Sequence, residues 1–212
     1  MYLPKHFDET RIEVLHELIR AHPLGTLVTL AASGLEANHI PFEIDPDPAP
    51  FGTLRGHVAR ANPVWREPPR EADALVIFQG PEAYVSPSWY ASKQEGGKVV
   101  PTWNYAVVHA YGRLRAIDDA AWLRAFVEKL TDRHEAGRTV RWKVTDAPAD
   151  YVDKMVTAIV GIELPIARLL GKWKVSQNRP ARDREGVVAG LHEQGGDVSR
   201  AMAELVRGAK DA

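Results

Sequence analysis

Six short segments of this chain combine His, Asn, Gln, Arg and Trp with residues that are otherwise typical of buried strands. They are Ala37–Phe42, Gly56–Pro63, Gln79–Pro81, Ser86–Tyr90, Val100–Tyr105 and Gly171–Asn178. A strand that only packs a core consists of Val, Ile, Leu and Phe, and a buried polar group costs free energy unless it is hydrogen-bonded. These side chains therefore either satisfy one another or converge on a polar ligand that has a flat apolar part.

The composition is that of a globular protein. The 212 residues are 45% hydrophobic and carry a formal net charge of -1, which is unlike a disordered chain. The absence of cysteine excludes disulfides, thiolate catalysis and cysteine-ligated metals. No two histidines have metal-ligand spacing on one expected element, so we predict no metal site. The near-neutral charge does not favour DNA binding, because DNA-binding domains usually carry a basic excess.

The sequence gives no sign of a membrane segment. Its apolar runs are too short to cross a bilayer, and the residues from Met1 to Phe7 lack the apolar core of a secretory signal. We therefore expect a cytoplasmic protein with no membrane association.

Apolar spacing, β-branched runs and turn residues predict mainly strands. Strands are expected at 24–30, 35–44, 53–59, 74–79, 99–117 (one bent strand or two) and 158–170, the last broken at Pro165. Helices are expected over 12–19 (capped by Asp8 or Thr10), over 122–130 (capped by Asp118 and Asp119) and around 151–155. Antiparallel strands with few helices between them indicate an α+β protein built on a β-barrel with flanking helices.

The tail from Arg182 predicts two short helices around a Gly195-Gly196 turn, the second of them capped by Asp197. This second helix carries Arg200 and Arg207 as its only basic residues. Because a DNA-reading helix presents polar and basic side chains to the bases, a helical hairpin explains the tail as well or better. We predict one main domain over 1–181 and a C-terminal hairpin over 182–212 that packs on it.

The order of the motifs resembles the PaiB family, which is described as FMN-binding negative transcriptional regulators. The resemblance runs from Tyr2 to about Leu191 and rests on Tyr2-x-Pro-x-His-Phe, His22–Thr26, His39–Phe42, Gly56–Pro63, Phe78–Pro81, Ser86–Tyr90, Val100–Tyr105 and Gly171–Arg179. It implies an FMN-binding split β-barrel like that of pyridoxamine phosphate oxidase and flavin reductases. It also implies a homodimer with flavin sites at the subunit interface. Some split-barrel proteins bind haem, but no residue here singles out haem.

The resemblance also implies a phosphate site at the end of the third expected strand. The FMN phosphate is a dianion, and such groups are bound by Arg, Lys and N–H donors. Arg60 is then the predicted phosphate ligand, with His57 and Asn62 beside it. The alternative is that Arg60 is a solvated charge and Asn62 a cap before Pro63.

The flavin ring has a polar edge and two flat faces, and each needs its own partners. Amides and imidazoles suit the edge, and aromatic side chains suit the faces. The predicted partners are Asn38, His39, Gln79, Trp89, Trp103 and Asn104. As alternatives, His39 is a core histidine bonded to a carbonyl, and the tryptophans pack a core or a dimer interface.

Polar and apolar residues alternate from Lys172 to Asn178 as in a strand. The alternation predicts one face with Lys172, Lys174, Ser176 and Asn178, and another with Trp173, Val175 and Gln177. Two lysines and a serine suit a phosphate or an anionic substrate, so Lys172, Lys174 and Gln177 join the predicted cofactor site. The alternative is an edge strand whose lysines prevent aggregation.

Two functions remain at this point. One is an FMN-binding negative regulator of transcription that acts directly or through a partner. The other is a flavin-dependent oxidoreductase or flavin reductase that uses NAD(P)H on a small substrate. The sequence identifies no catalytic residue and leaves direct DNA binding open.

Overall fold

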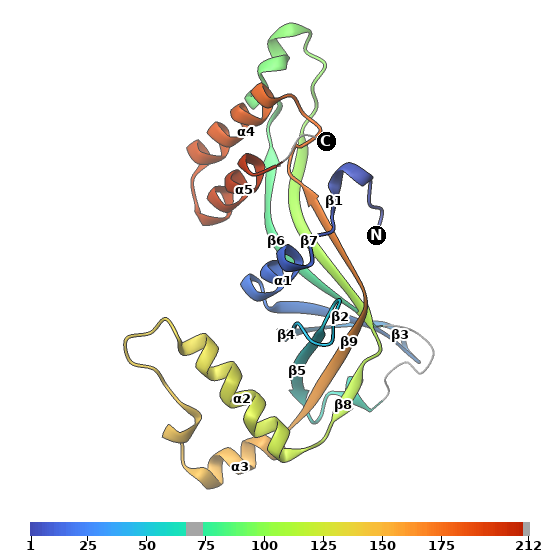
Figure 1. Cartoon of the computed structure of the whole chain (residues 1–212), viewed down its shortest axis with the longest axis vertical. Coiled ribbons are helices and arrows are strands. Elements are labelled where there is room, and N and C mark those ends of the chain that lie inside the picture. The colour runs from blue at the N-terminus through green and yellow to red at the C-terminus, as the bar shows by residue number, and fades with distance from the viewer. Residues whose placement is uncertain (67–73, 210–212) are drawn as a thin grey trace. The chain divides into compact units, whose positions relative to one another are not determined.

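The computed structural model describes residues 1–66 and 74–209. Antiparallel strands and five α-helices make up this part of the chain (Figure 1). The strands are β1 Asp8–Glu9, β2 Leu24–Ala31, β3 Gly34–Pro41, β4 Glu43–Asp45, β5 Thr53–Ala59, β6 Ala74–Val85, β7 Thr102–Gly112, β8 Arg115–Ile117 and β9 Ile159–Lys174. The helices are α1 Ile12–Ala21, α2 Ala120–Glu135, α3 Ala149–Thr157, α4 Ala181–Gln194 and α5 Asp197–Arg207. None of the helices in the described ranges is long and apolar enough to cross a membrane.

The chain divides into two compact units. The first unit contains the described residues of 1–22, 78–109 and 170–212, and the second contains those of 23–77 and 110–169. Strands β6, β7 and β9 each have residues in both units. The predicted hairpin from Arg182 onward belongs to the first unit; its last three residues lie outside the described part.

The second unit contains the strand pairs that hold the sequence motifs. β2 and β3 form the predicted hairpin, with Leu27 opposite Asn38, and β2 also pairs with β6. β5 pairs with β4 on one side and with β9 on the other. The core of this unit is built from fully buried side chains, among them Leu54 of β5, Ile162 of β9 and Phe42, which lies between β3 and β4. Helix α2 begins where predicted, because the Asp119 side chain accepts a hydrogen bond from Trp122 N at 2.7 Å.

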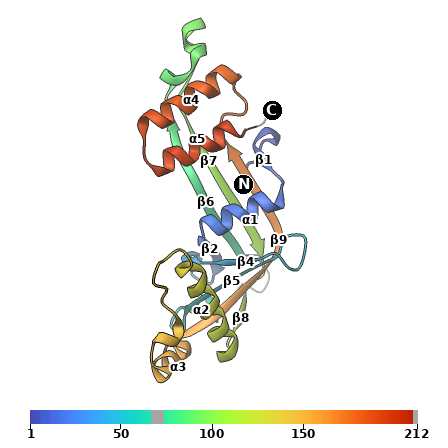
Figure 2. The ribbon, with the colours of Figure 1, turned by 60° about the vertical axis from the view of Figure 1, so that its left-hand side comes forward.

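In the first unit, the helical hairpin α4–α5 packs against β6 and the end of β9 (Figures 1 and 2). The shared core contains Val85, Val175, Val187, Leu191 and Met202, all of them buried. The hairpin is therefore part of this unit's core.

Three sequence predictions were wrong in detail. The strand expected at 74–79 continues to Val85 through Gly80-Pro81, a dipeptide typical of turns. The break expected at Pro165 does not occur: Pro165 lies opposite Thr53, and the next N–H donates to Gly52 O at 3.0 Å. The strand expected at 35–44 is interrupted at Phe42, between β3 and β4.

The predicted caps of two helices were also wrong. Arg11 is the N-cap of α1 and Gly196 that of α5, and neither helix has a side-chain cap. At α1 the Glu9 carboxylate accepts from Arg11 N instead, at 2.9 Å. At α5, Asp197 lies in the first turn and pairs with Arg200.

Candidate functional site

The predicted site residues fall into two groups, one in each unit. In the second unit, the turn after β5 is tied to β3 by two amides, since Asn62 Nδ2 donates to Asn38 Oδ1 at 2.8 Å. Asn62 also caps the short 3-10 helix Pro63–Trp65, because its Oδ1 accepts from Val64 N at 3.0 Å. The cap foreseen as an alternative role for Asn62 is therefore present, and one side chain fixes the turn in two directions.

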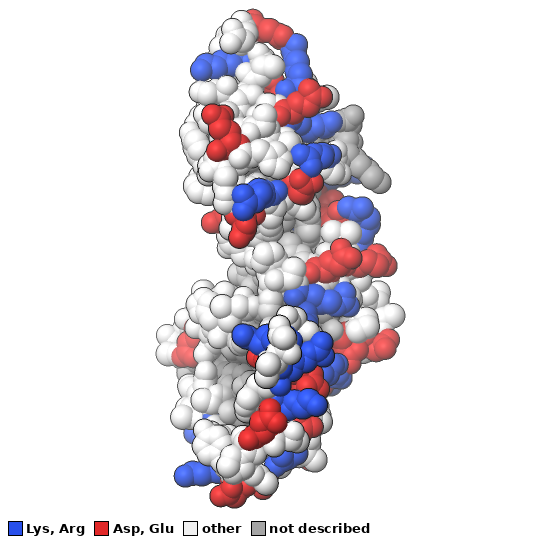
Figure 3. Space-filling model, turned by 90° about the vertical axis from the view of Figure 1, so that its left-hand side faces the viewer, with Lys and Arg blue, Asp and Glu red and all other residues white. Residues whose placement is uncertain are grey.

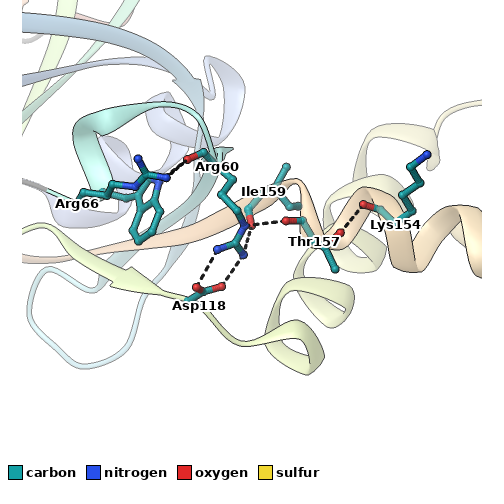
Figure 4. Close-up of polar contacts among 7 residues, drawn as sticks. Arg60, Arg66, Asp118, Lys154, Thr157 and Ile159 are labelled. Carbon is teal, nitrogen blue, oxygen red and sulfur yellow. Dashed lines mark hydrogen bonds and ion pairs between the residues drawn. The ribbon is translucent and has the colours of Figure 1, made fainter.

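Arg60, the predicted phosphate ligand, makes contacts with three segments of the second unit (Figure 4). Its Nη1 and Nη2 donate to the two Asp118 carboxylate oxygens at 2.9 and 2.6 Å. Its Nε donates to Thr157 O at 2.7 Å, and Nη2 also donates to Ile159 O at 3.1 Å. The guanidinium thus joins the end of β5, the start of α2 and the junction between α3 and β9.

These contacts shift the pKa values of Arg60 and Asp118. Hydrogen bonds from Arg60 lower the pKa of the Asp118 carboxyl below its usual value, and the same bonds raise the pKa of Arg60. Both side chains are therefore charged at neutral pH. Trp65 lies beside the pair, with its Nε1 donating to Arg60 O at 3.0 Å and its ring 5.9 Å from the guanidinium carbon.

The two histidines of this group differ in environment. His39 is exposed, so it is not a core histidine. His57 is half-buried against Phe126 of α2, with ring centroids 6.0 Å apart. Its Nδ1 is buried and has no hydrogen-bond partner in the described part of the chain. Burial lowers the pKa of His57, which is therefore neutral at pH 7.

In the first unit, the motifs on β7 and β9 lie side by side. Asn104 Nδ2 donates to Ser176 Oγ at 2.9 Å, and both residues are buried. Lys174 Nζ donates to the Thr102 hydroxyl and to Trp103 O, the latter at 2.6 Å. The structure thus pairs two motifs that lie about seventy residues apart in the sequence.

The predicted alternation from Lys172 to Asn178 stops early. β9 ends at Lys174, and Ser176 has a φ of 63°, in the left-handed region that breaks a strand. The Gln177 side chain turns back onto its own segment: its Oε1 accepts from Val175 N at 2.8 Å and its Nε2 donates to Trp173 O. Gln177 therefore holds the turn after β9.

Aromatic rings lie beside Lys172 of β9 and beside Trp103 of β7. Lys172 is 8% exposed, and its Nζ lies 5.6 Å from the Tyr2 ring and 5.4 Å from the Tyr105 ring. Trp103 is 55% exposed and meets the Tyr84 ring edge-on, with centroids 6.1 Å apart. Tyr2 and Tyr105 belong to the quoted sequence motifs, but neither of them, nor Tyr84, was predicted as a site residue, because tyrosines in strands are also typical of ordinary packing.

Trp89 and Gln79 lie elsewhere in the first unit. Trp89 packs on α4, where a Cβ added to Gly190 would overlap its indole ring and one added to Gly186 would overlap its carbonyl oxygen. Gln79 is exposed and donates to the Glu82 carboxylate. No three His, Asp or Glu side chains within residues 1–66 and 74–209 are grouped so that they could hold a metal ion.

Comparisons with known proteins give a family and a fold. The sequence profile of a family described as "Putative FMN-binding domain" matches residues 1–168. "Protease synthase and sporulation protein PAI 2" of Bacillus subtilis is 31% identical over 97% of this chain and 96% of its own length. An uncharacterized protein of Emericella nidulans is 36% identical over 98% and 96% of the two chains.

Two solved structures share the fold at low identity. The flavocytochrome Anf3 from Azotobacter vinelandii has a TM-score of 0.60 at 16% identity, over 81% of this chain and 72% of its own. The FAD and heme binding protein from Mycobacterium smegmatis has a TM-score of 0.57 at 20% identity, over 86% and 80%. The predicted α+β split-barrel fold is confirmed.

Proposed function

Because the chain belongs to the PaiB-like family of FMN-binding domains, we propose that it holds FMN between two copies of itself and acts as a negative regulator of gene expression. FMN is the cofactor of this family, and when bound it supplies hydride and one-electron chemistry. The residues of the chain supply binding, orientation and electrostatics.

The observation that carries the FMN proposal is the supply of free donors at the turn after β5. Arg60 has five N–H bonds, of which four have partners in the described part of the chain, so one Nη1–H remains available there. The main-chain N–H of Ala61 has no partner in the described part of the chain. Asn62 Nδ2 donates one N–H to Asn38, and its second N–H has no partner within residues 1–66 and 74–209. Three donors at one turn fit a phosphate, although Asp118 offsets part of the Arg60 charge.

A second copy of the chain gives the flavin ring its remaining contacts in this proposal. Large apolar side chains of the first unit are exposed, with Tyr2 at 84%, Val100 at 63% and Trp103 at 55%. Such side chains gather at protein interfaces and stack on flat ring systems. Asn38 and His39 of one copy then face the ring edge, and the exposed Trp103 of the second copy borders it.

The phosphate role of Arg60 is tested by freeing or removing its guanidinium. Arg60→Ala is expected to weaken FMN by roughly 1.5–3 kcal/mol, the range for a hydrogen bond to a charged group, and riboflavin far less. Asp118→Ala is the matched variant: it removes the competing carboxylate and should strengthen FMN relative to riboflavin. Fluorescence titration with both flavins measures the ratio.

The pair of variants separates phosphate binding from a purely structural clamp. Equal losses for FMN and riboflavin in Arg60→Ala, with no gain in Asp118→Ala, would remove Arg60 from the phosphate site. The mass of the protein is measured in the same solutions. Only monomer at micromolar concentration, with FMN bound, would rule out the shared site.

The regulatory part of the proposal draws on the Bacillus relative, whose name refers to protease synthesis and sporulation. We propose that regulation passes through a partner or the flavin rather than through DNA reading by α5. Arg200 pairs with Asp197 at 2.6 Å, and Arg207 pairs with Glu204. Lys and Arg are interspersed with Asp and Glu on the face drawn in Figure 3, which does not favour a phosphate backbone.

The tail is tested with the double variant Arg200→Gln, Arg207→Gln, because deleting α4 and α5 would also remove half of a core. At physiological salt we expect weak binding to promoter and scrambled duplexes alike, unchanged in the double variant. Arg113→Gln, an exposed residue of the second unit, is the control. If the unmodified protein and Arg113→Gln both bind the promoter at nanomolar affinity and the double variant does not, α5 reads DNA.

The oxidoreductase function stays as the second candidate. The observation that favours it is the group of basic and aromatic side chains on β7 and β9, which exceeds what one flavin phosphate needs.

A further inference from the structure

We propose that Lys172, Lys174 and Arg179 form a binding site for a planar aromatic anion, which is the substrate class of this flavin protein. The inference rests on the proposed FMN function and adds a second ligand to it. All three residues lie beyond residue 168, the last residue that the family profile matches.

The first argument is uncompensated charge. Four arginines of the second unit are half-buried, and each of them has a carboxylate partner: Arg55, Arg60, Arg124 and Arg133. Lys172 and Lys174 are buried or half-buried, and within residues 1–66 and 74–209 no carboxylate lies within ion-pair distance of either ammonium; Lys172 donates to Tyr2 O and Lys174 to Trp103 O. Arg179 is half-buried, and the buried carboxylate of Asp183 offsets part of its charge. A cation withdrawn from water is stabilised most by an opposite charge, and carbonyls and aromatic faces meet only part of that need. An anionic ligand supplies the missing charge.

The second argument is that these cations lie close together. Lys172 and Lys174 are two residues apart on β9, and a tight turn brings Arg179 back, since its N–H donates to Ser176 O at 2.9 Å. Burial lowers the pKa of the Lys174 ammonium, and the charges of Lys172 and Arg179 lower it further. Like charges held this closely repel one another until an anion lies among them.

The third argument concerns the shape of the ligand. Lys172 lies near the Tyr2 and Tyr105 rings, and the Arg179 guanidinium lies 4.8 Å from the centre of the Tyr90 ring. The Trp103 carbonyl accepts from Lys174 while its indole is exposed. Aromatic faces beside the cations favour a flat ring that carries the anionic group. A carboxylate or phosphate on an aromatic ring has this chemistry.

The test uses the FMN-loaded full chain and two probes that differ only in charge, 2-naphthoate and 2-naphthamide. Isothermal titration calorimetry should give at least tenfold tighter binding of the naphthoate. Cyclohexanecarboxylate, an anion without an aromatic ring, should bind more weakly than 2-naphthoate. Equal affinities for naphthoate and naphthamide would overturn the proposal.

Variants then assign the charge to this cluster. Lys174→Gln and Arg179→Gln should each reduce naphthoate affinity at least fivefold, Lys174→Arg should retain most of it, and Lys93→Gln, an exposed lysine of the same unit, is the control. Circular dichroism confirms that each variant is folded. Naphthoate affinity that is the same in all variants would contradict the assignment.

The last test compares how strongly Lys174→Gln weakens the binding of FMN and of riboflavin. If Lys174→Gln weakens FMN much more than riboflavin, the lysines bind the cofactor phosphate and the substrate assignment is wrong. If the protein binds no flavin at all, the proposed function fails. The naphthoate titration of the ligand-free chain still decides whether the anion site exists.

Discussion

Replacing Gly190 by alanine should lower the free energy of unfolding by about 2 kcal/mol. The new methyl group would overlap the Trp89 indole ring, and such overpacking costs up to about 3 kcal/mol. Alanine is a better helix former than glycine by about 1 kcal/mol, which offsets part of this loss inside α4. Urea denaturation of the two proteins measures the difference.

A double-mutant cycle with Trp89→Ala isolates this contact. Trp89→Ala removes the ring, so in that background Gly190→Ala should become neutral or stabilising by up to about 1 kcal/mol. Gly137→Ala, where no atom lies within 4 Å of the new Cβ, is the control for a general effect of alanine. A loss of the same size in both backgrounds would mean that Trp89 does not pack on α4.

Replacing Arg133 by methionine should destabilise the protein by about 2–3 kcal/mol. Arg133 of α2 pairs with Glu43 of β4 at 2.6 Å, and the Glu43 side chain is only 9% exposed. Leaving a buried carboxylate without its partner costs about 3–5 kcal/mol. Arg133 is itself 29% exposed, so water reaches the site and we expect a loss at or below the lower end of that range.

The matched variant combines Arg133→Met with Glu43→Gln. The second substitution removes the carboxylate charge that the first leaves unpaired. It should recover at least half of the stability lost in Arg133→Met. Arg138→Met removes a side chain that is 68% exposed and pairs with Glu135, three residues earlier at the end of α2, so it should change stability by less than about 0.5 kcal/mol. A double variant as unstable as Arg133→Met would show that helix packing, and not the charge, is responsible.

Local signals in the sequence predicted most elements of the fold. β5 begins and ends at the predicted residues, and Asp119 caps α2 as expected. Errors occurred where pairing with a neighbouring strand outweighs a local breaker. Pro165 continues β9 because its neighbour Ile166 still donates to Gly52, and Gly80-Pro81 continues β6 although the dipeptide is typical of turns.

The candidate site was predictable by residue type but not by partner. The segments around Asn62, Trp103 and Lys174 were identified because polar residues interrupt apolar strands. Their contacts depend on residues far away in the chain: Arg60 with Asp118, and Asn104 with Ser176. No spacing rule connects residues so distant. Whether the predicted residues bind FMN stays a prediction.

The composition of the first unit has a consequence for how the chain folds as it is synthesised. This unit combines residues 1–22 with 78–109 and with 170 onward, and β1 pairs with the far end of β9, where Asp8 lies opposite Lys172. A ribosome releases the N-terminal segment long before its partners, and contacts between distant residues form slowly. Leu15 of α1, whose side chain lies against Gly171 of β9, is therefore uncovered on the nascent chain until β9 has emerged. During that interval a chaperone that binds exposed leucine has its target in α1.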